Sequence, residues 1–218
     1  MSEAKIIGLF GVSQTDISIY LTSIIQNMAF ITAHCDNSYE GASEYCIPDP
    51  GGDLSVINYK NVDYYRLVSD ISSISGYDFV VVDFGVWPDM AALRTCDEIF
   101  LCLDPSISLL KKYKKYLTLL ERPVDVIVRG FLPDMVASKK IEHILTDENP
   151  FVTSFSVLNL TEEDEVMRIG MQYGHYKGFT GISREMEKVL VGMCRRVTEK
   201  KDSVILSAFR RARKGECA

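Results

Sequence analysis

Short apolar runs alternate with amphipathic stretches along most of the chain, a pattern typical of strands alternating with helices. An apolar run at 6–7 leads through a glycine-containing turn into a helical stretch at 15–28. The apolar stripe of that stretch is Ile17, Leu21, Ile24 and Met28. Further strands are predicted at 29–33, 54–59, 77–85, 98–103, 124–128 and 151–158, and further helices at 62–74, 106–120, 139–145 and 183–201. This order predicts an α/β fold, a doubly wound and mostly parallel sheet flanked by helices in three layers.

The stretch 77–85 gives the clearest strand signal. Its unbroken run of three valines at 80–82 indicates a strand buried on both faces, as in a parallel sheet. Asp83 follows at the carboxyl end of that strand, the edge at which open α/β sheets bind ligands. A carboxylate that caps a loop is the simpler interpretation of Asp83 taken alone. Residues 34–53, dense in Gly, Pro and Asp, predict a long loop before it.

Composition adds limits to this picture. With 218 residues the chain is long enough for one α/β domain at 1–200, followed by a helical or basic tail at 201–218. The net charge of −6 argues against a DNA-coating surface, so nucleic acid is an unlikely partner. No apolar run approaches a membrane span, and the first residues lack the pattern of a signal peptide. The six cysteines form no C-x-x-C pair and are interpreted as reduced thiols of a cytoplasmic protein.

The turn after the first strand nearly matches the phosphate-binding pattern G-x-x-x-x-G-K-[ST]. Gly8 matches its first glycine and Thr15 its hydroxyl residue, while Ser13 and Gln14 replace the second glycine and the lysine. Thr15 or Asp16 is the expected N-cap of the helix that follows. The candidate nucleotide-binding residues are Gly8, Gly11, Ser13, Gln14, Thr15 and Asp16. An ordinary strand, turn and helix is the competing interpretation.

Four segments in order make the chain resemble the ParA/MinD family of P-loop ATPases, and within it the pilus-assembly localisation proteins of the TadZ/CpaE type. They are KIIGLFGVSQTDIS, YDFVVVDFG, CDEIFLCLDPSISLLKKYKKYL and VDVIVRGFLP, and the resemblance spans about residues 4–198. It implies a P-loop fold that binds ATP with Mg²⁺ and a homodimer formed across the nucleotide. It also implies a role in placing other proteins, in a pilus, secretion or partition complex.

The departures from the family pattern concern its chemistry. The two positions where the family carries lysines hold Leu9 and Gln14. The adenine-contacting asparagine falls near Val128 or Arg129 and is absent. The magnesium side keeps more of the pattern, and if nucleotide binds, the expected Mg²⁺ residues are Thr15, Asp83 and Asp36.

Loss of both lysines bears directly on hydrolysis, because phosphoryl transfer depends on positioning and on stabilising charge. Removing one preorganised donor costs on the order of 10²–10³ in rate. A replacement cation is needed for turnover, and the candidates are Arg94, Lys111, Lys112 and Arg129. The sequence thus predicts a degenerate, non-hydrolysing localisation module without catalytic residues. An ATP-binding switch and an atypical ATPase are the alternatives.

Two charged surface segments bear on partners. The acidic run at 162–165 is interpreted as a solvated helix start. The C-terminal segment SVILSAFRRARK pairs apolar residues with basic ones, and either docks as a final helix or lies on an anionic membrane. Docking or a partner contact is favoured because the apolar run is short. The expected partners are a protein of an assembly complex and a second copy, in a cytoplasmic protein that is peripheral at the membrane if the tail binds lipid.

Overall fold

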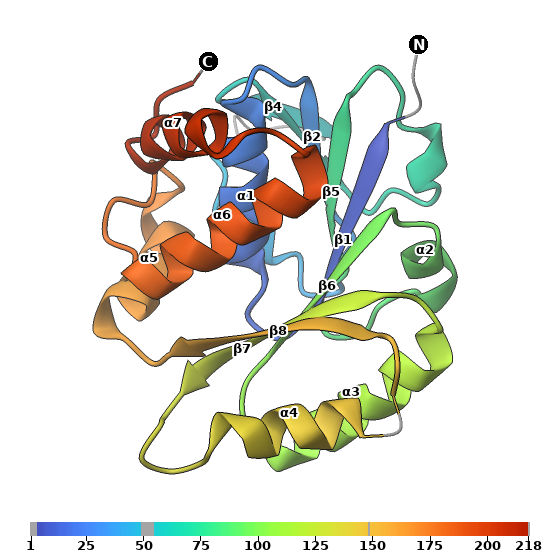
Figure 1. The fold of residues 1–218 in the computed structure, drawn as a ribbon. Helices are drawn as coiled ribbons and strands as arrows, with labels where there is room; N and C mark the ends of the chain where they lie inside the picture. The colour runs from blue at the N-terminus through green and yellow to red at the C-terminus, as the bar shows by residue number, and fades with distance from the viewer. Residues whose placement is uncertain (1–3, 49–54, 148, 218) are drawn as a thin grey trace.

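An eight-stranded sheet forms the centre of the computed structural model, which describes residues 4–48, 55–147 and 149–217 (Figure 1). The strands lie in the order β3-β4-β2-β5-β1-β6-β7-β8, and only the β3–β4 pair is antiparallel. Their bounds are β1 Lys5–Gly11, β2 Thr32–Asp36, β3 Val56–Tyr59, β4 Val62–Arg66, β5 Phe79–Asp83, β6 Glu98–Leu103, β7 Val124–Phe131 and β8 Val152–Asn159. The predicted doubly wound α/β sheet is therefore confirmed.

Helices cover both faces of the sheet (Figure 1). One apolar cluster contains α1, α6 and α7 with the inner side of α5, and a second contains α2, α3 and α4 on the opposite face. Their bounds are α1 Thr15–Gln26, α2 Met90–Arg94, α3 Ile107–Leu120, α4 Ser138–Thr146, α5 Glu162–Gly174, α6 Arg184–Thr198 and α7 Asp202–Arg213, with short 3₁₀ helices at Ala42–Tyr45 and Ile71–Ser73. Within the described residues no helix is long and apolar enough to span a bilayer.

The helix predicted at 62–74 is wrong. Its first part is strand β4, in which Val62 and Tyr64 are buried while the residues between and after them are not. That period of two suits a strand paired with β2, and the pairing overrides the helical spacing further along. Leu67, counted in the expected apolar face, is exposed and has a left-handed backbone with φ of 48°. Only the 3₁₀ turn at Ile71–Ser73 remains helical.

Other boundaries moved by a few residues. The strand expected at 29–33 is β2, which begins at Thr32 because Ala29 has a positive φ of 64° that ends the turn after α1. The strand expected at 54–59 is β3, and residue 54 lies outside the described residues. Helix α2 was not predicted. The acidic run at 162–165, expected to be the start of a helix, forms the first turn of α5.

The C-terminal segment is a docked helix in this structure. Ile205, Ala208, Phe209 and Ala212 of α7 are buried, and α7 contacts both α1 and α6.

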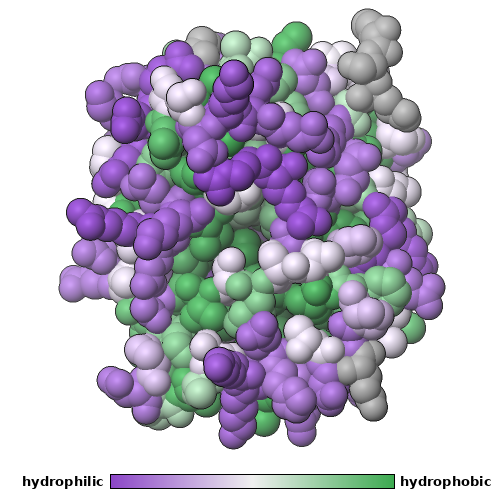
Figure 2. Space-filling view, viewed as in Figure 1, coloured by the Kyte–Doolittle hydropathy of each residue, from purple (hydrophilic) through white to green (hydrophobic). Residues whose placement is uncertain are grey.

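Apolar side chains remain uncovered elsewhere, on the sheet face between α6 and β8 (Figure 2). A groove of about 350 Å³ lies there, with Phe100, Ile127, Val189 and Met193 among its lining residues.

Candidate functional site

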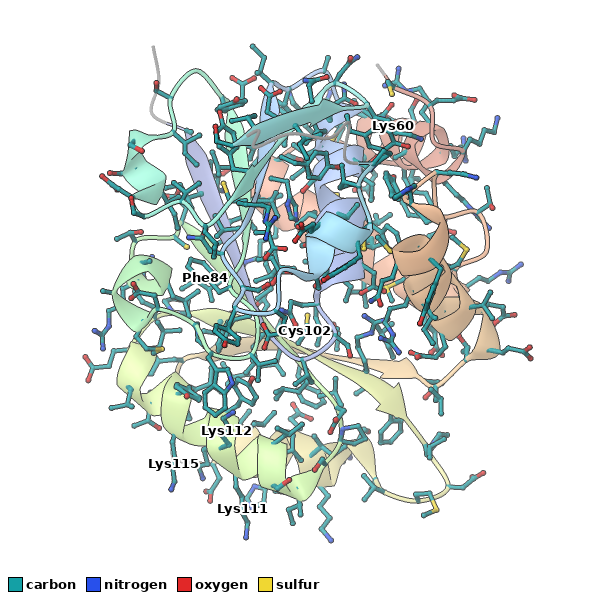
Figure 3. The ribbon with its side chains drawn as sticks, turned by 180° about the vertical axis from the view of Figure 1, so that it is seen from behind. Lys60, Phe84, Cys102, Lys111, Lys112 and Lys115 are labelled. Atoms are coloured by element: carbon teal, nitrogen blue, oxygen red, sulfur yellow. The ribbon has the colours of Figure 1, made fainter. Side chains whose placement is uncertain are left out.

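The loop between β1 and α1 lies at the carboxyl end of the central strands, as a phosphate-binding loop does. Gly11 is essential to its path. Its φ is 119°, and a Cβ on it would lie 1.9 Å from the carbonyl oxygen of Cys102 on β6. Val12 then donates its backbone N–H to that same carbonyl at 2.8 Å. Figure 3 shows Cys102 near the centre of the molecule.

The side chains of Gln14 and Thr15 close onto Asp83. The Gln14 amide donates to Asp83 Oδ1 at 2.7 Å, and the Thr15 hydroxyl donates to Asp83 Oδ2 at 2.8 Å. The backbone N–H of Gly85 adds a third hydrogen bond at 2.9 Å. Gln14 and Asp83 are both buried, so these bonds are shielded from water. The structure thus brings the predicted residues Gln14, Thr15 and Asp83 together, and their polar side-chain groups bond one another.

The start of α1 differs from expectation. Gln14 is the N-cap residue, it has helical backbone angles and its side chain makes no capping hydrogen bond, so neither Thr15 nor Asp16 caps the helix. Each of those two side chains has another partner. Thr15 bonds Asp83, and Asp16 makes a bidentate ion pair with Arg129 of β7, at 2.5 and 2.9 Å. Arg129 also donates to the carbonyl of Ser13, the loop residue with a positive φ of 54°.

Asp36 of β2 lies beside Asp83 of β5 in the parallel register. Its carboxylate nevertheless has four protein partners. It accepts the backbone N–H and the hydroxyl of Ser38 and those of Ser43, at 2.6 to 3.0 Å. Asp36 therefore holds the following loop in place. Sequence reasoning missed the two serines, because they lie among many polar residues in that stretch.

Gly8 and Leu9 belong to strand β1 and do not reach the loop. A Cβ on Gly8 would lie 2.9 Å from Cys96 Sγ, so this glycine serves the packing of the sheet against α2. Leu9 is fully buried. Gly8 therefore matches the first glycine of the motif in the sequence, but it lies within strand β1 and not in the loop.

Burial dominates the electrostatics of Asp83. Burial, together with the charge of Asp36, raises its pKa from 3.8 to about 6, and the hydrogen bonds from Gln14, Gly85 and Thr15 lower the pKa only in part. A lysine at position 14 would pair with this carboxylate, whereas the amide of Gln14 carries no charge. The Gln14 Oε1 atom has no hydrogen-bond partner.

None of the four candidate cations is presented freely to the loop. Arg129 is held by Asp16, and Arg94 donates to the carbonyls of Leu119 and Leu120 at the end of α3. Lys112 lies over the ring of Trp87, 3.4 Å from its centroid. Figure 3 shows Lys111 at the outer side of α3, away from Cys102 and the loop.

These residues do not fit a hydrolytic site for ATP with Mg²⁺. Carboxylate and hydroxyl oxygens suit Mg²⁺, and Thr15 and Asp83 keep oxygen lone pairs beyond the hydrogen bond that joins them. The carboxylate of Asp36 already accepts four hydrogen bonds from Ser38 and Ser43, and the lysine position holds the neutral Gln14. A small cavity of about 150 Å³ lies beside the loop, lined in part by Ser13, Arg129 and Arg168. It is smaller than the roughly 300–1,000 Å³ of typical ligand pockets.

No protein-family model and no curated protein matches this sequence. Solved structures do match its fold. A ParA family ATPase from Chlorobium tepidum TLS is 15% identical with a TM-score of 0.57, over 97% of this chain and 98% of that one. MinD in the MinC:MinD cell division complex of Aquifex aeolicus is 15% identical with a TM-score of 0.57, over 95% of each chain. Cyanothece McdA in its ATP complex is 10% identical with a TM-score of 0.60, over 92% and 98%. The chain therefore has the P-loop α/β fold of ParA/MinD-type ATPases.

Proposed function

We propose that this protein is a degenerate ParA/MinD-like module that binds and positions other proteins and does not hydrolyse ATP. The observation that carries the proposal is the contact between Gln14 and Asp83. It places a neutral amide at the position of the phosphate-binding lysine, and that amide donates to a carboxylate of the protein itself. Arg129 and Arg168 beside the loop are each paired with a carboxylate, so charge on a transferring phosphoryl group has no free cation to stabilise it. The complex it serves, on the family resemblance, is a pilus, secretion or partition assembly.

The alternative is a switch that binds ATP without cleaving it. The retained pair of Thr15 and Asp83 favours it, since a hydroxyl and a carboxylate are a magnesium-binding pair in P-loop proteins. Backbone N–H groups at the start of α1 could also hold phosphate oxygens. This function requires the Gln14 side chain, which bonds Asp83 at 2.7 Å, to make room for phosphate when nucleotide enters.

Calorimetric titration with ATP and Mg²⁺, with phosphate release measured on the same sample, separates these functions. The proposal expects no turnover and no heat up to millimolar ATP. Micromolar binding that is lost in Thr15→Ala and kept in Thr118→Ala would establish the switch instead. Thr118 is a matched control because it lies exposed on α3 and its hydroxyl bonds only within that helix. Magnesium-dependent phosphate release from the unaltered chain would overturn the proposal.

Localisation in the source cells gives a second test of the same point. A fluorescent fusion carrying Thr15→Ala should form the same pattern as the unaltered fusion, because the proposed placing role needs no nucleotide. A diffuse signal from Thr15→Ala, with normal protein level and an unchanged signal from Thr118→Ala, would favour the switch.

A further inference from the structure

Helix α5 carries an apolar stripe on its outer face. Val166, Ile169 and Tyr173 are 60%, 44% and 87% exposed, although their spacing of three and four residues puts them side by side on the helix. The opposite side, with Asp164 and Met171, is the one buried against the protein. An apolar helix face left in water is typical of a surface that binds another helix.

A groove lies beside this stripe. Its volume is about 380 Å³, and it is lined by Glu162, Glu163, Val166, Met167 and Gly181. The floor is apolar, while the two glutamates, both exposed, put carboxylates at the rim. Among the described residues neither glutamate has an ion-pair partner. The groove therefore suits an apolar group that ends in a hydrogen-bond donor.

We propose that a second copy of this chain fills the groove, through an antiparallel pairing of the two α5 helices. Val166 and Tyr173 are seven residues apart, about 10 Å along the helix. A two-fold axis between Ile169 and Gly170 therefore places Tyr173 of the second copy over Val166. Its ring lies on Val166 and Met167, and its hydroxyl donates to Glu163. The symmetry forms the same contact twice.

Two further features support this arrangement over other occupants. Gly170 and Gly174 have open space where a Cβ would be, so a second helix can approach closely at Ile169. Charge also matches, because Glu162 and Glu163 lie at one end of α5 while Lys177 follows its other end. An antiparallel pair brings the glutamates of one copy toward Lys177 of the other, whereas a parallel pair sets like charges side by side. The pairing needs no nucleotide.

Analytical ultracentrifugation over a wide range of protein concentration tests the pairing. Two short helices bury less than the roughly 1,600 Å² of a standard interface, so a dimer constant in the micromolar range is expected. Tyr173→Ala should weaken the dimer by about tenfold or more, because a buried tyrosine anchor is lost. Tyr39→Ala is the control, since Tyr39 is 92% exposed on a different surface and its loss should leave the dimer unchanged.

Disulfide trapping locates the interface. The background variant is Cys217→Ser, because Cys217 is the exposed cysteine and the other five are buried. On it, Ile169→Cys should form a dimer under mild oxidation, since the two positions lie next to the two-fold axis. Leu119→Cys on α3, where Leu119 is 60% exposed, should not. The disulfide should also fail to form when Tyr173→Ala is added.

A monomer at every concentration, including with Ile169→Cys under oxidation, would overturn the inference and leave the stripe to a different protein. A dimer that survives Tyr173→Ala but is lost in Tyr39→Ala would also overturn it, because the interface would then lie on another face. Neither experiment contains ATP, so its failure is independent of the nucleotide measurements that test the proposed function.

Discussion

Gln14 and Asp83, 69 residues apart in the sequence, are joined by a 2.7 Å hydrogen bond at the point where a P-loop protein would bind phosphate and metal. The bond gives a buried carboxylate a neutral donor at the position where P-loop proteins carry a lysine. Burial and the nearby charge of Asp36 keep the pKa of Asp83 raised, because the neutral amide of Gln14 offsets them only in part. Stability and pH dependence are therefore the properties through which this contact can be measured.

Gln14→Glu should destabilise the protein at neutral pH. The change replaces the amide donor by a second carboxylate against Asp83, so a hydrogen bond is lost and like charges meet in a buried site. We expect a loss of about 1–3 kcal/mol in the free energy of unfolding, measured by urea denaturation. The loss should shrink below pH 6, where one carboxyl can hold a proton shared with the other. Gln172→Glu, at an exposed position of α5, should change little, and an equal loss there would contradict this account.

Asp83→Asn should stabilise the protein at neutral pH. The folded pKa of Asp83 is about 6 and its ordinary value is 3.8, so the folded state holds the proton more tightly. The stability linked to that proton is fully present below pH 3.8 and is lost as pH rises through 6, to a total on the order of 3 kcal/mol. The variant lacks this loss, and its new amide can donate to the unpartnered Gln14 Oε1. Urea denaturation of both proteins from pH 4 to 7 should give a difference that grows with pH; a constant difference would count against the raised pKa.

His34 should act in the opposite direction. It is fully buried on β2, its Nε2 lies 3.0 Å from Ser18 Oγ, and burial lowers its pKa from 6.5 to about 4. The stability linked to the neutral ring is present above pH 6.5 and is lost as pH falls toward 4, again on the order of 3 kcal/mol. His34→Phe keeps a ring against Tyr64, so its unfolding free energy should vary less between pH 6.5 and 4. A slope as steep as that of the unaltered chain would show that His34 is not the source.

The layered fold followed from the sequence because several central strands, such as β5 and β6, carry continuous apolar runs. The run Val80–Val82 needs no partner to be recognised, and it places Asp83 at the carboxyl edge of the sheet. Strand β4 was not predicted, because the evidence for it is its pairing with β2 and not its local sequence. The apolar spacing after Val62 also fits a helix, and only the pairing with β2 decides for a strand.

The residues of the candidate site were predictable, but their contacts were not. Sequence placed Gln14, Thr15 and Asp83 near one another through the order of strands, yet it could not show that the three close on themselves. The sequence makes Arg129 a candidate replacement cation and Asp16 a candidate N-cap, and it does not indicate that the two form an ion pair. A pair separated by 113 residues leaves no local pattern, because only the tertiary fold brings the start of α1, which carries Asp16, next to β7, which carries Arg129.

The Asp16–Arg129 pair gives a prediction about what holds the loop. Both side chains are almost completely buried, so Arg129→Ala leaves a carboxylate without water or a counter-charge. We expect a loss of about 3–5 kcal/mol in the free energy of unfolding by urea denaturation. Arg195→Ala is the matched control. Arg195 makes a bidentate pair with Asp202 at 2.8 and 2.9 Å, but both side chains are more than half exposed and solvent screens the pair, so the loss should be far smaller than in Arg129→Ala.

A double variant tells whether the ion pair stabilises the fold or only offsets the free-energy cost of burying its own two charges. Asp16→Leu combined with Arg129→Met fills the same space with apolar groups, and no charge is left unpaired. If the large loss in Arg129→Ala comes from the isolated Asp16 carboxylate, the double variant should recover most of it, as buried ion pairs replaced by apolar residues do. Arg129 also donates to the Ser13 carbonyl, so the part not recovered measures how much the guanidinium holds the loop itself. Equal losses in the single and double variants would assign the whole effect to that loop contact, because the ion pair would then contribute nothing.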